Sequence, residues 1–236
     1  MTTSLSSFLS STYIGKRGFG LFNAEIDNRA TYTCSTVKGT AITFPASEDK
    51  YLVRSILLTN ISESNNASIT GEVYFSNTNT AVVIANGLPM NVGSTLELIK
   101  KPKVFSANDE IRLTSNANST VSAYITYQTD TSLNYFGNGV TLTSSANTDV
   151  FVASAGDSVV ESIHIANISS VDIDMELYIA HANSEPISYL AKTYIIPTNA
   201  AIELNEQPKL LSTGQKIMAK APASNLVSVV ISGIYR

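Results

Sequence analysis

The chain has 236 residues and a formal net charge of −4; 44% of its residues are hydrophobic and only 14% are charged. The apolar fraction is enough for packed cores, which argues against general disorder, and the acidic balance offers no positive surface to a phosphate backbone. We therefore expect no nucleic-acid partner, and because no run of about 18 apolar residues occurs, we expect no membrane partner.

The first segment, residues 1–36, is predicted to be an N-terminal assembly arm. Its opening residues lack the basic and apolar regions of a secretory signal, and glycines then alternate with apolar and basic side chains. Glycine lets a backbone follow a partner's surface closely, and aromatic rings anchor interfaces, so we expect the arm to dock on a neighbouring subunit or on another protein. In the alternative, the arm adds a strand to the following domain and caps it. The candidate assembly residues are Tyr13, Ile14, Lys16, Arg17, Phe19 and Phe22.

Residues 37–130 are predicted to form an antiparallel β-sandwich. Apolar and polar residues alternate with a period of two, which is typical of half-buried strands, and turn-forming residues such as Asn86 and Gly87 interrupt them at short intervals. Strands are predicted near 41–44, 52–61, 70–76, 81–85, 94–98, 110–114 and 120–128.

Residues 131–236 are predicted to form a second sandwich of the same kind. The connection at 129–139 is short and carries a turn-forming pair, Asn138 and Gly139, so the two sandwiches should be neighbours with limited freedom. Strands are predicted near 148–152, 159–168, 173–180, 189–196, 200–204, 215–220 and 226–234.

An internal duplication supports this division. Residues 51–62 align without a gap on residues 158–169, and six positions are identical in the two segments. After a small loop deletion, 72–75 is expected to match 176–179. Further matches join 96–98 to 202–204, 102–103 to 208–209 and 121–125 to 227–231. The predicted fold class is therefore all-β: two tandem, duplicated antiparallel β-sandwiches, immunoglobulin-like or jelly-roll, behind an N-terminal arm.

Few residues suggest chemistry. His164 aligns with Leu57, which predicts a strand-face side chain without a catalytic or metal role, and His181 is expected in a solvated loop. Cys34 is the only cysteine, so no intrachain disulfide can form, and no neighbouring base lowers the pKa of its thiol. We expect no cofactor, and we expect that the protein is not an enzyme.

Two charged clusters were weighed as sites. Asp172, Asp174 and Glu176 alternate along one predicted strand, which could place three oxygen ligands on one face for calcium, but a solvated face is favoured because calcium usually needs about six oxygens. The basic cluster at 100–103, which contains Lys100, Lys101 and Lys103, is expected to be a solvated strand end.

The opening stretch from Ser6 to Gly15 resembles N-terminal segments of virion structural proteins of tailed phages, especially T4-like marine cyanophages. The strand motif Ser-Ile-x-x-x-Asn-Ile-Ser, in a chain rich in Ser, Thr, Asn and Ala, is similar to compact β domains of such proteins. The resemblance implies a non-enzymatic neck, tail or capsid-decoration protein that is present in many copies. It also implies assembly in the host cytoplasm, location in the virion, contacts with other virion proteins and homo-oligomer formation.

A second hypothesis stays open, a carbohydrate-binding or adhesin module that recognises the host surface. Sugar sites usually present exposed aromatic rings, and the chain has no tryptophan. A structural role is therefore the preferred prediction.

Overall fold

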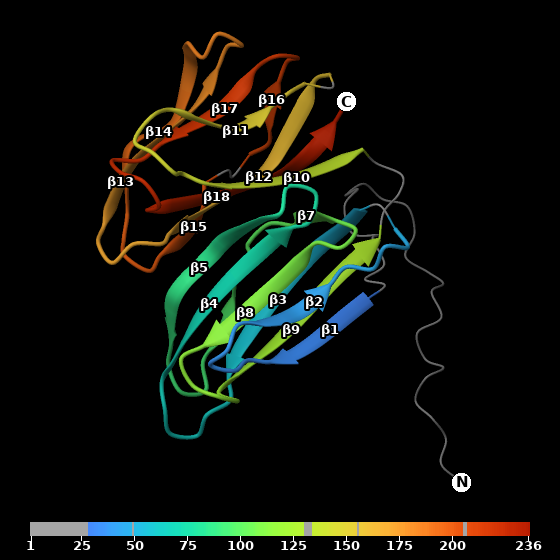
Figure 1. The fold of residues 1–236 in the computed structure, drawn as a ribbon, viewed down its shortest axis with the longest axis vertical. Coiled ribbons are helices and arrows are strands. Elements are labelled where there is room, and N and C mark those ends of the chain that lie inside the picture. The colour runs from blue at the N-terminus through green and yellow to red at the C-terminus, as the bar shows by residue number, and fades with distance from the viewer. Residues whose placement is uncertain (1–27, 49, 130–133, 155, 205–206) are drawn as a thin grey trace, which may run out of the picture.

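The computed structural model describes residues 28–48, 50–129, 134–154, 156–204 and 207–236. These residues form antiparallel strands in two successive sandwiches (Figure 1). No helix occurs within these residues. The first sandwich contains β1 (Asn28–Thr33), β2 (Gly39–Thr43), β3 (Lys50–Asn60), β4 (Ala67–Phe75), β5 (Thr80–Met90), β6 (Thr95–Glu97), β7 (Lys103–Ser106), β8 (Glu110–Ser115) and β9 (Val121–Thr129). The second contains β10 (Tyr135–Thr141), β11 (Thr148–Val152), β12 (Ser158–Asn167), β13 (Ile173–Ala180), β14 (Pro186–Ile196), β15 (Ala201–Glu203), β16 (Lys209–Leu211), β17 (Lys216–Lys220) and β18 (Val227–Tyr235).

The strand order of the first sandwich recurs in the second. One sheet of the first sandwich has the order β1-β9-β3-β6, with β7 also paired to β3, and the other has the order β2-β8-β4-β5. In the second sandwich the orders are β10-β18-β12-β15, with β16 paired to β12, and β11-β17-β13-β14. Adding nine to each strand number in the orders of the first sandwich gives the strand orders of the second sandwich. This repetition confirms the predicted fold class, a tandem duplication of an antiparallel sandwich.

The pairing register of the central strands is also the same in the two sandwiches. Ile56 lies opposite Ile125, and Ile163 lies opposite Ile231, with a β-bulge two to three residues earlier in both β3 and β12. Ile56 and Ile163 are both fully buried, as expected for one core position that occurs twice. Leu98 and Leu204 also correspond, but Leu98 is buried whereas Leu204 is only partly buried.

One part of the sequence alignment is wrong by two residues. Gly71 pairs with both Ala85 and Leu113, and Leu177 pairs with both Ala191 and Ala219. The offset between the copies is therefore 106 in these strands, so residues 72–75 correspond to 178–181 instead of 176–179. A shift of two residues keeps every side chain on its own face of a strand, so the alternation pattern could not distinguish the two alignments.

Strands also form outside the predicted strand ranges, among them β1 and β10. Residues 28–33, which were assigned to the arm, pair with β9 as β1, as the alternative of an added strand predicted, and Ala30 and Tyr32 pack on the first core. Residues 135–141, which were assigned to the connection, pair with β18 as β10. The pair Asn138 and Gly139 is thus part of an extended strand and does not form a hairpin turn.

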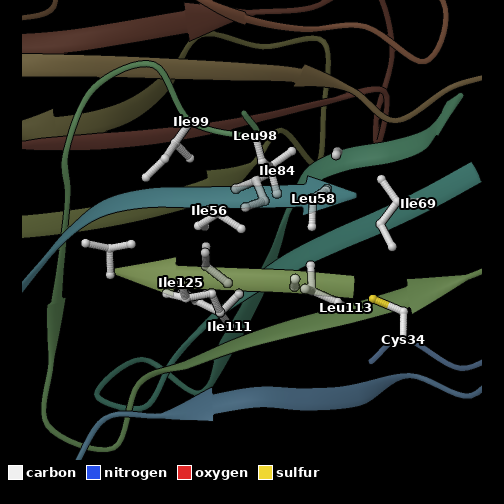
Figure 2. Close-up of a cluster of buried hydrophobic side chains, with 14 of the residues drawn as sticks. Cys34, Ile56, Leu58, Ile69, Ile84, Leu98, Ile99, Ile111, Leu113 and Ile125 are labelled. Carbon is white, nitrogen blue, oxygen red and sulfur yellow. The ribbon is translucent and has the colours of Figure 1, made fainter. Parts of the chain in front are cut away.

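Each sandwich has its own apolar core. In the first, branched aliphatic side chains from both sheets interdigitate around Ile56, Ile111 and Ile125, as Figure 2 shows. The second core is centred on the equivalent Ile163 and Ile231. These cores account for most of the large buried side chains and set the two layers of each sandwich.

The sheet β10-β18-β12-β15 is covered on both of its faces. Neighbouring residues of β18 point to opposite sides of the sheet, and Ile231 lies in the second core while Val230 lies in the first. The outer face of this sheet therefore packs against the edge of the first sandwich formed by β5 and β7, and the two sandwiches are in direct contact (Figure 1).

Candidate functional site

The interface between the sandwiches contains a buried group of polar side chains, Lys103, Ser162, His164 and Glu203, here called the interface cluster. Lys103 comes from β7 of the first sandwich, and the other three come from β12 and β15 of the second. The Nζ of Lys103 lies 2.7 Å from Oε2 of Glu203 and also donates hydrogen bonds to Oγ of Ser162 and to the carbonyl of Lys101. The cluster thus joins the two sandwiches through an ion pair.

The burial of Lys103 corrects the prediction of a solvated basic cluster at 100–103. Lys103 is only 2% exposed, whereas Lys100 is exposed and Lys101 is half-buried. Sequence pattern could not reveal this burial, since the surface that covers Lys103 belongs to a sheet encoded about 60 to 130 residues later.

Glu203 also satisfies backbone donors beside the bulge of β12. Its Oε1 accepts hydrogen bonds from the Ile163 N–H at 2.8 Å and from the Ser162 hydroxyl at 2.9 Å. In the first sandwich Glu97 has the same role. Its two carboxylate oxygens accept hydrogen bonds from the Ile56 N–H and the Ser55 hydroxyl, both at 2.7 Å. The repeated Ser-Ile pair and the repeated glutamate are therefore parts of one structural device.

Burial and neighbouring side chains act in opposite directions on the pKa of Glu203. Desolvation alone would raise the pKa of its carboxyl, but His164 and the Nζ of Lys103 more than offset this and lower the pKa to about 2. The Nδ1 of His164 stands 3.8 Å from Oε2, outside hydrogen-bond range, so the direct partner is Lys103. Glu203 is therefore ionised across the neutral and mildly acidic range.

His164 is oriented by the first sandwich. Its Nε2 lies 2.8 Å from the carbonyl oxygen of Ile84 in β5, and since a carbonyl only accepts, Nε2 carries a proton. Nδ1 is buried and has no hydrogen-bond partner among the described residues. A cavity of about 210 Å³ lies beside the ring, and its walls include Leu96, Ile202 and Glu203.

The cluster contains a serine, a histidine and a carboxylate, but they do not form a nucleophilic triad. Ser162 donates its hydroxyl proton to Glu203 and accepts from Lys103, while the proton-bearing nitrogen of His164 faces a backbone carbonyl. The histidine therefore does not contact the Ser162 hydroxyl, as the general base of a triad must. The arrangement fits a structural role at the interface.

Two glycines of β10 allow the sandwiches to approach closely. A Cβ on Gly137 would overlap the carbonyl oxygen of Val104, and one on Gly139 would lie 2.5 Å from the ring of Phe75. The Val104 N–H in turn donates to Oγ of Ser232 at 3.0 Å. Glycine is required here for space, since both residues lie in an extended strand.

The asparagine that occurs in both copies of the repeat motif is a buried turn anchor in each copy. Asn60 donates from its side-chain amide to the carbonyls of Asn65 and Met90, and its Oδ1 accepts from the Ser62 N–H. Asn167 repeats this pattern with the carbonyls of Val171 and Ile196. The repeat motif thus records structural requirements of the sandwich.

The other predicted residues do not gather into a site. His181 is exposed, and Asp172 uses Oδ1 to accept from the Thr198 N–H. Asp174 and Glu176 line a pocket of about 150 Å³ together with Lys220. Among the described residues, no group of three or more His, Cys, Asp or Glu side chains is placed to hold a metal ion.

Burial raises the pKa of the Cys34 thiol to about 11, so its thiolate is scarce at neutral pH. The six assembly candidates of the arm lie within residues 1–27, outside the described part of the chain. The described residues include no helix with the length and apolar character needed to span a membrane.

No family model and no curated protein matches the sequence. Among solved structures, similarity is found to a chain of the Sulfolobus Turreted Icosahedral Virus, at 13% identity and a TM-score of 0.27, over 89% of this chain and 60% of that one. The STIV MCP matches at 12% identity and a TM-score of 0.24, over 88% and 96% of the two chains. The CBM22-1–CBM22-2 tandem domain of Paenibacillus barcinonensis Xyn10C matches at 7% identity and a TM-score of 0.25, over 88% and 86%. At such low scores these similarities carry no functional argument.

Proposed function

We propose that the protein is a non-enzymatic structural component of a virus particle, which acts by assembling with other proteins. The observation that carries this proposal is the interface between the sandwiches. Its polar residues are buried, and Lys103 and Glu203 pair across the two domains, which fixes the two bodies relative to one another. A rigid pair of sandwiches with a weakly charged surface suits repeated protein contacts.

The finer proposal is a neck, tail or capsid-surface protein of a tailed phage, located in the virion after assembly in the host cytoplasm. It is supported by the resemblance of the stretch from Ser6 to Gly15 to N-terminal segments of such proteins. The low charged fraction of 14% supports it too, because a surface that repels its neighbours weakly permits close packing of many copies.

Purified particles from the source of this chain test the proposal. Mass spectrometry of intact particles should detect the chain at a fixed ratio to the other structural proteins, and a labelled antibody should decorate one defined location. Particles that lack the chain while remaining complete and infectious would contradict the proposal.

An adhesin that binds carbohydrate is the second candidate, and one observation favours it. Tyr189 and Tyr194 on β14 are 41% and 43% exposed, and Lys192 lies over the ring of Tyr189. Exposed aromatic rings provide the stacking area that sugars use. Binding of host polysaccharide that disappears in Tyr189→Ala and Tyr194→Ala variants would support this function, whereas equal binding by these variants and the native chain would exclude these rings as the site.

A further inference from the structure

The edge of the second sandwich formed by β14 and β16, here called the open edge, is the counterpart of a covered edge in the first. Val104 in β7 and Leu210 in β16 occupy equivalent positions, opposite Leu52 and Val159 respectively. Val104 is 3% exposed beneath the second sandwich, whereas Leu210 is 59% exposed. The open edge thus presents an apolar side chain, Leu210, where the first sandwich buries its counterpart.

The open edge also carries the equivalent of the interface lysine. Lys209 corresponds to Lys103, and its Nζ donates to the Gln207 carbonyl at 2.9 Å just as Lys103 donates to the Lys101 carbonyl at 3.1 Å. Lys103 has a carboxylate partner in Glu203, but Lys209 pairs with no carboxylate among the described residues. Apolar contact area and a cation that pairs with no described carboxylate therefore lie side by side on β16.

The surface that fits such an edge is known from the second sandwich itself. There the docked face combines the glycines of β10 with small side chains on β12 and β18 and the carboxylate of Glu203. The small side chains of this face are Ser162, Ala166, Ser228, Val230 and Ser232.

The first sandwich has the equivalent face with its carboxylate exposed, but larger side chains alter it. Thr59 and Thr126 stand at the positions of Ala166 and Ser232, and three further replacements are bulkier. Pairing register places Arg29 and Thr31 where the second sandwich has Gly137 and Gly139. Tyr124 likewise takes the place of Val230, which is buried in the core of the first sandwich. Since even a Cβ at position 137 would overlap a carbonyl oxygen of the docked edge, these side chains prevent the same docking on the first sandwich.

We propose that the open edge binds a β-sheet face on a different protein, lined by glycine and other small residues and carrying one carboxylate opposite Lys209. Arg29, Thr31 and Tyr124 prevent a second copy of this chain from occupying the edge. The chain therefore adds to an assembly in one direction and does not polymerise through these two surfaces. This inference deepens the proposed structural function by naming the chemistry of one partner, and it holds or fails for the purified chain alone.

The test converts the first sandwich into a partner of the required chemistry. A full-length variant with Arg29→Gly, Thr31→Gly, Tyr124→Val, Thr59→Ala and Thr126→Ser has both the open edge and a face that accepts it, so it should form head-to-tail chains. Sedimentation velocity up to about millimolar protein, the effective concentration that a short tether provides, should show larger species than the native chain forms. Adding Lys209→Glu or Glu97→Lys should weaken this association about tenfold or more, and combining both should restore it.

Matched variants separate docking from damage. Thr33→Gly removes a side chain from the same strand at a position whose counterpart is Thr141, and Lys220→Glu reverses an exposed charge away from β16, so neither should change association. Thermal unfolding of this five-fold variant like that of the native chain shows that it folds. A folded five-fold variant with the native oligomeric state would overturn the proposal. So would a native chain whose own oligomers are lost in Lys209→Glu and Glu97→Lys.

Discussion

At the residue scale, Glu97 and Glu203 show how one structural device gained a second role. Both carboxylates accept hydrogen bonds from an Ile N–H and a Ser hydroxyl beside a bulge. Only Glu203 also pairs with a lysine of the other sandwich. A buried ion pair is costly to desolvate, so its value here lies in fixing one relative placement of the two sandwiches.

Removing Lys103 should therefore be more damaging than removing an exposed lysine. Lys103→Met leaves the Glu203 carboxylate buried without its cation, which should lower the free energy of unfolding by about 3–5 kcal/mol. Adding Glu203→Gln to this variant should recover part of the loss, since the unpaired charge is gone. Lys38→Met, which breaks an exposed pair with Glu72, should cost at most about 1 kcal/mol. Urea unfolding of the four chains measures these differences, and equal losses for Lys103 and Lys38 would contradict the structural role of the cluster.

Acid should weaken the native protein through Glu203. The pKa of this carboxyl is about 2 in the folded chain against an ordinary 4.5, so the folded state favours the ionised form. The resulting stability is complete above pH 4.5 and is lost as the pH falls towards 2; a shift of this size corresponds to on the order of 3 kcal/mol. Free energies of unfolding measured between pH 6 and pH 2 should fall less steeply for Glu203→Gln than for the native chain. Parallel curves for the two proteins would show that Glu203 does not titrate in this way.

At the scale of strands, four long elements were predicted well and some short ones were missed. β3, β9, β12 and β18 were expected close to their observed bounds, and each has nine or more residues. β5 was predicted over only its first half. The short β6 and β15 were predicted, but β7 and β16 were not, and β10 contains glycines that resemble a turn. The interface cluster could not be predicted at all, because its residues meet only after two separate sheets have formed.

The glycines of β10 should control the contact between the sandwiches. Gly137→Ala and Gly139→Val insert atoms against the Val104 carbonyl and the Phe75 ring, so the interface should open while each sandwich keeps its own core. Limited proteolysis near residues 130–133 should accelerate, and thermal unfolding should separate into two transitions. Thr141→Val, at the far end of the same strand, serves as the matched control. A single unshifted transition in the glycine variants would mean that the interface tolerates them.

Equivalent core positions should respond alike in the two sandwiches. Ile56→Ala and Ile163→Ala each remove the centre of one core, and each should cost about 2–5 kcal/mol of unfolding free energy. Denaturant unfolding measures both. Near-neutral effects in either variant would contradict the assigned packing.

At the scale of the whole molecule, the duplication produced two sandwiches that are no longer equivalent. The edge of the first is covered and that of the second is open, while the docked face of the second has a bulkier counterpart on the first. A contact between two unlike surfaces generates rings or filaments when both occur on one chain. Arg29, Thr31 and Tyr124 on the first sandwich prevent this self-association, so the open edge is left to bind a different protein.

The last prediction concerns residues 1–27, which contain all six assembly candidates. A chain that begins at Asn28 keeps every described strand, including β1 and its pairing with β9, so its thermal unfolding should match that of the full chain. It should nevertheless fail to join the assembly, because Tyr13, Phe19 and Phe22 supply the aromatic area that anchors interfaces. A chain that begins at residue 37 also loses β1 and should unfold at a lower temperature, since Ala30 and Tyr32 pack on the first core. Replacing the three aromatic residues by serine in the full chain should reproduce the assembly defect without the loss of stability. If the chain from Asn28 were strongly destabilised, the alternative that residues 1–27 cap the first sandwich would hold instead.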